Sequence, residues 1–482
     1  MTTPADPVLA RLAASERDGI ERLRDWLRIP SISTDPAYKD RVREAAVWAA
    51  DHLRASGFDA ELIPTGEPEG AGHPVVLARC EGEPGVPRVL FYGHYDVQPA
   101  DESEPWRHGP FNPAIEETEH GPQIVCRGAS DDKGQVSSFL EAARAWFEET
   151  GLAAGGVPMT VLIEGEEESG SVNLERFLEA HKDKLDDCAV CVISDTGMLG
   201  RGKPAITTGI RGLTYTEVTL HGPSHDLHSG MWGGRIANPA NELCRILAQL
   251  HDADRRVTIP GFYDSVRETP KDELDAWSRL DFSEADALRE IGLPPEASLG
   301  EAGRNAFERG WARPTCDING FKSGYIGEGA KTIIPASAAA KVSFRLVADQ
   351  DPEQVTEAFF KWLDERTPPG FRWEKHDHGG GWPATVSTDE PVLGAAMRAI
   401  KRACAVEPAL IKTGGSIPVA GLLKRLLGID TVFMGFGLDD DRVHSPNEKF
   451  EIECWRMGAR SHAVLIEELL GLGAGGGTQK RG

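Results

Sequence analysis

The stretch Arg88-Val-Leu-Phe-Tyr-Gly-His-Tyr-Asp-Val97 determines both the expected fold and the position of the candidate site. Its first residues, up to Tyr92, favour a buried β-strand, and His94 and Asp96 follow at the end of that strand. Side chains two residues apart in a strand point to the same face, so this histidine and this carboxylate are neighbours. Burying both is costly unless a metal ion uses them, with His94 binding through one ring nitrogen and Asp96 accepting a hydrogen bond from the other. Taken alone, however, such a pair more often starts a polar loop.

Strand-like and helical runs alternate on both sides of this stretch. We expect strands over 75–79, 89–95, 159–164 and 189–194, and helices from Leu9 to Leu27 and over 39–56, 134–149 and 173–184. This alternation predicts an α/β fold, a mostly parallel sheet with helices on both faces. In such sheets function gathers at the carboxyl ends of the strands.

The pattern changes near Ala205. Alternating strands over 214–221 and 338–347 and a polar, helical insertion over 263–313 predict a second, α+β unit. The Gly-Gly-Gly-Trp-Pro stretch at 379–383 is interpreted as a hinge. The expected organisation is therefore a catalytic domain over 1–206 and 383–472, an inserted lid and dimerisation domain over 207–382, and a disordered tail over 473–482.

Composition limits the partners. The 482 residues carry a formal net charge of −24, which argues against nucleic acid because phosphate binding needs a basic surface. No apolar run approaches the ~20 residues of a membrane helix, and the N-terminus lacks the features of a signal peptide, so no membrane partner is expected. The eight scattered cysteines are typical of cytosolic thiols and indicate a cytoplasmic protein.

Further acidic residues and one histidine stand at strand ends or in loops. Asp131 and Asp132 precede a helix and could simply cap it, and the glutamates within 164–168 could form a solvated turn. Asp195 and His444 follow other apolar strands. Two divalent ions ~3.5–4 Å apart need a bridging carboxylate and further nitrogen and oxygen ligands, and these residues supply such a set.

Five strings in order carry a resemblance: GHYDVQPA (93–100), CRGASDDKG (126–134), EGEEESGS (164–171), ISDTG (193–197) and VHSPNEK (443–449). The chain resembles the di-zinc family of aminopeptidases, carboxypeptidases (carboxypeptidase G among them) and aminoacylases over about residues 15–470. Within it, the dipeptidase branch of carnosinases and cytosolic non-specific dipeptidases is the most similar. The resemblance implies metal-dependent hydrolysis of dipeptides.

It also implies a role for each site residue. His94 and Asp195 would bind the first metal, Glu168 and His444 the second, and Asp131, rather than Asp132, would bridge them. Asp96 would orient His94. Glu167 would act as general base on the metal-bridging water and then as general acid, with Glu166 as its rival because three glutamates adjoin. Zinc is the first choice for both ions, and manganese or cobalt are alternatives.

In the inserted domain, the resemblance implies that His228 reaches into the active site of the partner subunit of a homodimer and stabilises the oxyanion. Arg345, Thr332, Gly415 and Ser416 would bind the substrate, with its carboxylate at Arg345 and Ser416. Dipeptidase relatives carry an acid before Gly-Gly-Ser, where this chain has Thr413. An amidohydrolase or carboxypeptidase acting on N-acyl amino acids is therefore the alternative function, and a non-enzymatic binding protein is the rival from another class.

Overall fold

The computed structural model describes residues 3–101 and 103–475. Contacts divide the chain into two compact units: unit 1 comprises residues 1–208, 386–411 and 422–482, and unit 2 comprises residues 209–385 and 412–421. The expected organisation put residues 412–421 in the first unit. These residues instead belong to unit 2. The Ser416 hydroxyl, for example, donates a hydrogen bond to the carbonyl oxygen of Arg211 in the same unit.

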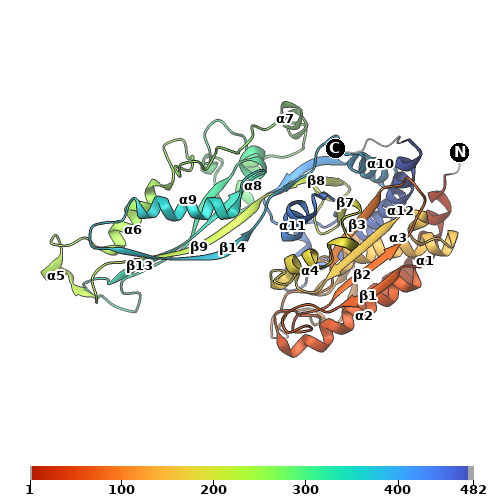
Figure 1. Ribbon diagram of the computed structural model, residues 1–482, viewed down its shortest axis with the longest axis horizontal. Helices are drawn as coiled ribbons and strands as arrows, with labels where there is room; N and C mark the ends of the chain where they lie inside the picture. Colours follow the sequence, from red (N-terminus) through yellow and green to blue (C-terminus); the bar gives the residue numbers. More distant parts are fainter. Residues whose placement is uncertain (1–2, 102, 476–482) are drawn as a thin grey trace. The chain divides into compact units, whose positions relative to one another are not determined.

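Unit 1 is built around one large sheet (Figure 1), whose strands run in the order β1-β2-β6-β3-β7-β17-β8. Their bounds, in that order, are Asp59–Ile63, Val75–Cys80, Met159–Glu164, Arg88–His94, Cys188–Ile193, Asp430–Phe433 and Ala205–Ile210. β3 is parallel to β6 on one side and to β7 on the other, and β17 is parallel to β7. The carboxyl ends of β6, β3, β7 and β17 therefore meet along one edge of the sheet.

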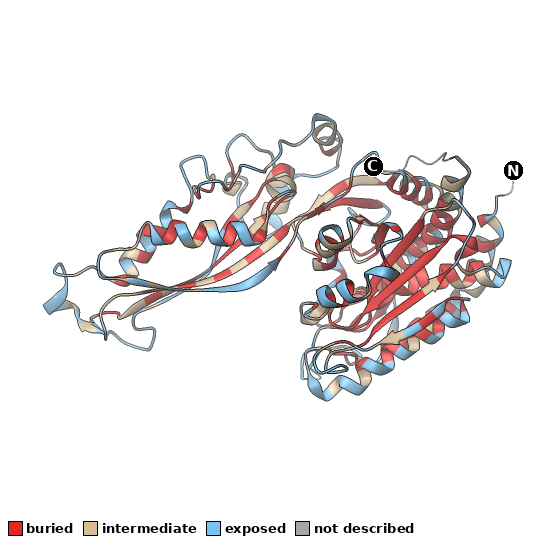
Figure 2. Cartoon of the chain, in the orientation of Figure 1, coloured by how far each residue is buried: buried red, intermediate tan, exposed pale blue. Residues whose placement is uncertain are grey.

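The central strands are buried because both faces of the sheet are covered. Every residue of β3 and of β6 is buried (Figure 2). One continuous core joins strand residues such as Val89 and Phe91 to helices on one side of the sheet, and Phe91 stacks on Phe139 at 3.7 Å between ring centroids. The helices of that core are α1 (Ala5–Leu27), α2 (Lys39–Ala55), α3 (Lys133–Thr150), α10 (Pro391–Cys404) and α12 (Ile452–Gly475).

Shorter elements complete unit 1. Helix α4 (Leu174–Ala180) lies on the other face of the sheet (Figure 1), with Leu174, Phe177 and Leu178 buried. A small antiparallel sheet has the order β18-β5-β4, with bounds Lys449–Glu451, Gly121–Val125 and Ala114–Thr118. Helix α11 (Pro418–Leu427) and strand β16 (Ala409–Thr413) each contain a boundary between the units.

Unit 2 contains an antiparallel sheet in the order β11-β13-β9-β14, with bounds Thr315–Ser323, Ser337–Leu346, Gly212–His221 and Arg372–Gly381. Helices α6 (Pro239–Leu247) and α9 (Pro352–Asp364) share a core with this sheet, in which Leu243, Phe344 and Phe359 are buried. Beyond one end of the sheet, β10 (Leu227–His228) pairs with β12 (Ile333–Ile334) and leads into α5 (Ser229–Trp232). The short strand β15 (Ala384–Thr385) pairs with Ile210 and Gly209 of β8.

Three segments were expected to be a helical insertion, a hinge and a disordered tail. The insertion at 263–313 is mostly irregular, with the short helices α7 (Lys271–Trp277) and α8 (Glu284–Glu290). In the stretch 379–383, which was interpreted as a hinge, Gly380 and Gly381 pair with β9 as the end of β14. Of the expected tail, 473–475 continue helix α12, and 476–482 lie outside the described residues.

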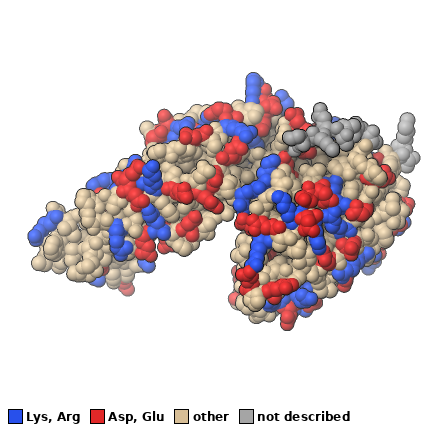
Figure 3. Space-filling model, in the orientation of Figure 1, with Lys and Arg blue, Asp and Glu red and all other residues tan. Residues whose placement is uncertain are grey.

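Two observations concern nucleic acid and membranes, which were not expected as partners. Acidic and basic side chains are interspersed over the face shown in Figure 3. Among residues 3–101 and 103–475, no helix is both long and apolar enough to cross a membrane.

Candidate metal centre

The carboxylate of Asp131 lies between two histidines. Its Oδ1 is 3.0 Å from Nε2 of His94, and its Oδ2 is 2.9 Å from Nε2 of His444. His94 ends strand β3, Asp131 precedes helix α3, and His444 follows strand β17. One carboxylate thus presents a separate oxygen to each imidazole, which is the arrangement that a bridging ligand requires.

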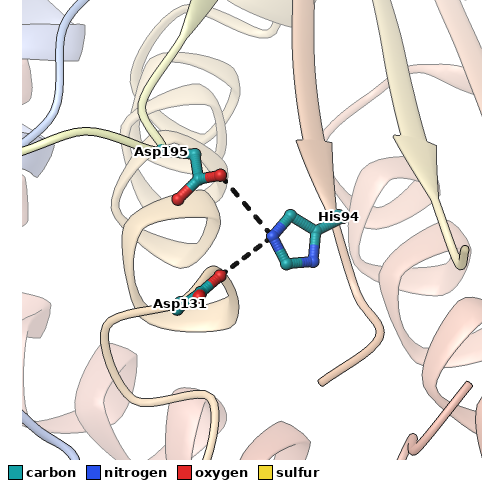
Figure 4. Close-up of side chains that lie close together, drawn as sticks. All are labelled: His94, Asp131 and Asp195. Atoms are coloured by element: carbon teal, nitrogen blue, oxygen red, sulfur yellow. Dashed lines mark ion pairs between the residues drawn. The ribbon is translucent and has the colours of Figure 1, made fainter. Parts of the chain in front are cut away.

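Each histidine also faces a second carboxylate. Nε2 of His94 is 3.7 Å from Oδ2 of Asp195 (Figure 4), and Nε2 of His444 is 3.3 Å from Oε2 of Glu168. Within each of the two groups, the candidate ligand atoms lie within 4.8 Å of one another. The structure therefore brings together all five residues that the sequence analysis assigned to metal binding.

The electrostatics of this cluster favour positive charge. Burial opposes ionisation of Asp131, but His444 and His94 outweigh it and hold the pKa of that carboxyl well below its ordinary value. The hydrogen bonds to Asp131 and Glu168 raise the pKa of His444 to about 10. Burial and the nearby charge of Asp131 raise the pKa of Asp195, and burial raises that of Glu168. Buried carboxylates crowded in this way remain ionised when cations lie among them.

The donor set fits divalent cations. Nε2 of His94 is buried and makes no hydrogen bond, and it faces carboxylate oxygens of Asp131 and Asp195. Imidazole nitrogen together with carboxylate oxygen suits zinc, manganese and cobalt. Asp96 contacts two members of this set. Its backbone carbonyl oxygen lies 3.1 Å from Nδ1 of His94 in a hydrogen bond, and its carboxylate Oδ1 lies 3.4 Å from the same nitrogen without one. Its Oδ2 accepts the backbone N–H of Glu168 at 3.0 Å.

Glu167 lies on the turn that follows β6, beside this cluster. Burial raises the pKa of its carboxyl well above the ordinary value, and the charges of Asp195, Asp131 and Glu168 act in the same direction, against His94. A carboxylate whose proton affinity is raised in this way is suited to accept a proton at neutral pH. Glu166, its rival, directs its carboxylate elsewhere, to the backbone N–H of His73 and to the side chain of Asn173.

The substrate-binding candidates form two groups within unit 2. Nη1 of Arg345 donates to Oγ of Ser416 at 3.0 Å, and Gly415 adjoins this pair. His228 and Thr332 form the second group, where the backbone N–H of Ser229 donates to the carbonyl oxygen of Thr332. The His228 side chain is exposed, and its Nδ1 accepts the N–H of Gly230.

Two further residues, not expected from the sequence, contact the site residues: Glu448 at the metal cluster and Arg211 at the Arg345 group. The Glu448 carboxylate is fully buried and accepts the backbone N–H groups of Gly128, Ser130 and Asp131, so it fixes the loop that carries Asp131. In unit 2, a Cβ added to Gly414 would lie 2.5 Å from Nη2 of Arg211, which shows how closely the loop before Ser416 packs on that guanidinium. Burial and the charge of Arg345 lower the pKa of Arg211 to about 10. In the sequence, only their positions could have indicated these two residues. Glu448 lies within the last motif, and Arg211 lies at a strand end.

Clustered histidines and carboxylates at the carboxyl ends of parallel strands define a metal-dependent hydrolase site. The family model of "Peptidase family M20/M25/M40" matches residues 90–468, and the chain belongs to this family. The Cys-Gly metallodipeptidase DUG1 of Saccharomyces cerevisiae is 32% identical over 461 residues, which cover 92% of this chain and 94% of that protein.

Two further comparisons agree. The human Beta-Ala-His dipeptidase is 30% identical over 466 residues, 93% of this chain and 90% of its own. The crystal structure of Sso-CP2, an M20 family metallo-carboxypeptidase from Sulfolobus solfataricus, superposes with a TM-score of 0.78 at 33% identity and covers 94% of this chain and 99% of that chain. The α/β fold with a separate α+β unit, and the predicted class of metallopeptidase in the dipeptidase branch, are confirmed.

Proposed function

We propose that this chain hydrolyses dipeptides with the unit 1 cluster as its catalytic centre. The observation that carries the proposal is the position of Asp131, which offers one oxygen toward His94 and the other toward His444. The relatives named for Cys-Gly and Beta-Ala-His dipeptidase activity support a dipeptide as the substrate class.

Two divalent cations fit the cluster. His94 and Asp195 would hold one, His444 and Glu168 the other, and Asp131 both; zinc is the first choice, with manganese or cobalt as alternatives. When bound, such ions lower the pKa of water toward ~7 and polarise the scissile carbonyl. Asp96 fixes the ring orientation of His94, and Glu448 fixes the loop of Asp131.

Glu167 moves the proton. As a carboxylate it takes a proton from the attacking water, and as a carboxylic acid it passes that proton to the nitrogen of the leaving amine. Its half-buried position beside Asp131 and Asp195 raises its proton affinity, which suits both steps.

The group around Arg345 would bind the carboxylate of the substrate. Arg345 and Arg211 supply two guanidinium groups, Ser416 a hydroxyl, and Gly415 a backbone N–H that bonds only weakly, at 3.3 Å, to Thr413. Planar guanidinium groups and neutral donors are well matched to a carboxylate. Thr332 and His228 would contact the reacting end, with His228 stabilising the oxyanion.

The distance between these two groups supports a homodimer. Arg345 and Ser337 are eight positions apart on β13, about 27 Å at ~3.4 Å per residue, and His228 and Thr332 lie beyond the Ser337 end. A dipeptide is only about 7 Å long, so it cannot reach both groups of one subunit. His228 would therefore come from the partner subunit. Large apolar side chains are exposed near His228, namely Met231, Trp232, Tyr325 and Ile326, and would be covered by a second copy.

Mixing two inactive variants tests this arrangement. Glu167→Gln removes the base and His228→Ala removes the oxyanion donor, and each homodimer would be inactive. In a mixed dimer, one site has both residues intact when His228 acts across the interface, so refolding an equimolar mixture would restore about a quarter of wild-type activity. No restored activity in a mixture shown by ultracentrifugation to be dimeric would contradict the arrangement.

Hydrolysis of N-acyl amino acids is the second candidate, favoured by Thr413 before Gly414 and by the similarity to a metallo-carboxypeptidase. Because threonine is neutral, it cannot form the ion pair that an acid at this position would form with a free substrate amine. The eight cysteines, all free thiols in the structure, support a cytoplasmic location for either activity.

The deciding experiment assays a panel of free dipeptides, tripeptides and N-acetyl amino acids with metal-loaded, chelator-stripped and metal-restored protein. Metal-dependent cleavage confined to dipeptides is the expected result. A preference for N-acetyl amino acids would transfer the same site to the second function, and no turnover by protein with two bound metals would contradict both.

A further inference from the structure

We infer that Glu166 is a positioning residue that holds the turn bearing Glu167. The inference rests on the proposed function, in which Glu167 transfers the proton. The family resemblance favours Glu167 as the base and leaves Glu166 as its rival, because three glutamates adjoin. Their surroundings in the structure differ, and those of Glu166 define a different role.

The Glu166 carboxylate accepts hydrogen bonds from one backbone amide and one side-chain amide. It is 6% exposed, and Oε1 accepts the backbone N–H of His73 at 2.8 Å. Nδ2 of Asn173 donates to Oε1 at 3.0 Å and to Oε2 at 2.8 Å. A buried carboxylate is costly unless it is well hydrogen-bonded, and an amide in its place would turn an NH2 group toward one of these donors. The site is therefore built for a carboxylate.

The segment that receives Glu166 is itself fixed. Thr65 closes the loop 65–73, because its carbonyl oxygen accepts the N–H groups of Gly70 and Gly72 and its hydroxyl donates to the carbonyl oxygen of His73. Nζ of Lys39, in α2, donates to the carbonyl oxygens of Gly70 and Ala71. Glu166 thus ties the end of β6 to a loop that is anchored on a core helix.

The backbone of Glu166 closes the catalytic turn. Its carbonyl oxygen accepts the N–H groups of Ser169 and Ser171, at 3.2 and 2.7 Å. On the other side of Glu167, the N–H of Glu168 is held by Asp96. Glu167 therefore lies between two anchored neighbours, and its carboxylate has little freedom to leave the cluster. Misplacement of a catalytic group by about 1 Å can lower a rate about 100-fold.

The test compares Glu166→Gln and Asn173→Ala with the control Glu69→Gln, which changes an exposed glutamate of the same loop. Both site variants are expected to lower kcat, Glu166→Gln by about 10- to 100-fold, with KM within about threefold and two metals retained. The double variant should lose little more than Glu166→Gln alone, because both act through one contact. Backbone amides of 65–73 and 168–171 should exchange faster with deuterium, a readout that requires no substrate.

Three outcomes would overturn the inference. Glu166→Gln could abolish turnover while Asn173→Ala is unaffected, which would make Glu166 the base. Both variants could keep wild-type kcat. Metal content and thermal midpoint could fall in parallel with kcat, which would make the contact a general stabiliser. A wild-type protein inactive on the whole panel would contradict the proposed function instead, and the exchange measurement would still report on the contact.

Discussion

Gln98 donates its side-chain amide to the carboxylate of Glu168, with 2.7 Å between Nε2 and Oε2. Gln98 follows β3 and Glu168 follows β6, so the contact joins the loops at the ends of two neighbouring strands. The same amide is 3.3 Å from the carbonyl oxygen of Glu168. Gln98 therefore restricts the rotamer of a residue assigned to the second cation.

We expect Gln98→Leu to weaken binding of one cation and to spare the other. Outer partners of metal ligands typically contribute 10- to 100-fold in affinity, so titration of the stripped protein should show one site weakened by about that factor. The site with His94 and Asp195 has no contact with Gln98 among the hydrogen bonds described and should bind as in the wild type. Gln354→Ala, at an exposed position of α9, serves as the control. Equal weakening of both sites would argue against this assignment.

Glu167→Gln should retain both cations and lose turnover. General acid–base catalysis contributes about 10²- to 10⁴-fold, and an amide cannot accept the proton from water. The measurements are kcat on a good dipeptide and metal content by elemental analysis. A variant that loses its metals would show that Glu167 is a ligand, and one that keeps kcat would exclude it as the base.

The two arginines of unit 2 predict a charge-specific effect on substrate binding. Arg345→Met and Arg211→Met should each raise KM about 10- to 100-fold, since hydrogen bonds to charged groups contribute about 1.5–3 kcal/mol. A dipeptide amide, which lacks the carboxylate, should bind the wild type weakly and be affected little by either substitution. If Arg211→Met raises KM equally for the acid and the amide, Arg211 does not contact the carboxylate.

His52 predicts a loss of stability in mild acid. Burial lowers its pKa to about 4, although Glu141 acts in the opposite direction. The unfolded chain then binds a proton near pH 6.5 that the folded chain binds only near pH 4. The contribution of neutral, buried His52 to the free energy of unfolding is therefore complete above pH 6.5 and is lost as the pH falls toward 4.

Urea unfolding at pH 7 and pH 5 measures this effect. His52→Leu should make the free energy of unfolding less dependent on pH by about 2 kcal/mol between those values. His120→Gln, at an exposed position, should leave the dependence unchanged. An unaltered pH dependence in His52→Leu would place the acid sensitivity elsewhere.

Much of unit 1 could be predicted because two simple patterns coincide there. Apolar runs such as 159–163 end at the residues that carry the chemistry, and parallel strands bring their carboxyl ends together. The position of His94 was therefore available from the sequence. Glu168 follows β6, Asp195 follows β7 and His444 follows β17, whereas Asp131 precedes helix α3.

Neither pattern could separate the three adjacent glutamates. Their roles depend on contacts with Asn173 and with His73, which is 93 positions away from Glu166. Periodicity carries no information about such partners. The role of Glu166 required coordinates for that reason.

Unit 2 departs from its sequence pattern because tertiary ion pairs override local preference. In the insertion, the guanidinium of Arg313 donates twice to the carboxylate of Glu301 at 2.8 Å, and both side chains are nearly buried. Such pairs hold irregular backbone where charged composition alone favours helix. The glycines at 380–381 form strand because they pair closely with Leu213 and Thr214.

The dispersion of the metal-binding residues along the chain has a consequence for biosynthesis. His94 is translated early and His444 late, and the residues between them include all of the inserted part of unit 2. A ribosome must pass residue 444 before both imidazoles can face Asp131. A nascent chain therefore cannot assemble the hydrolytic centre before unit 1 is complete. Until then, it cannot hydrolyse the peptides around it.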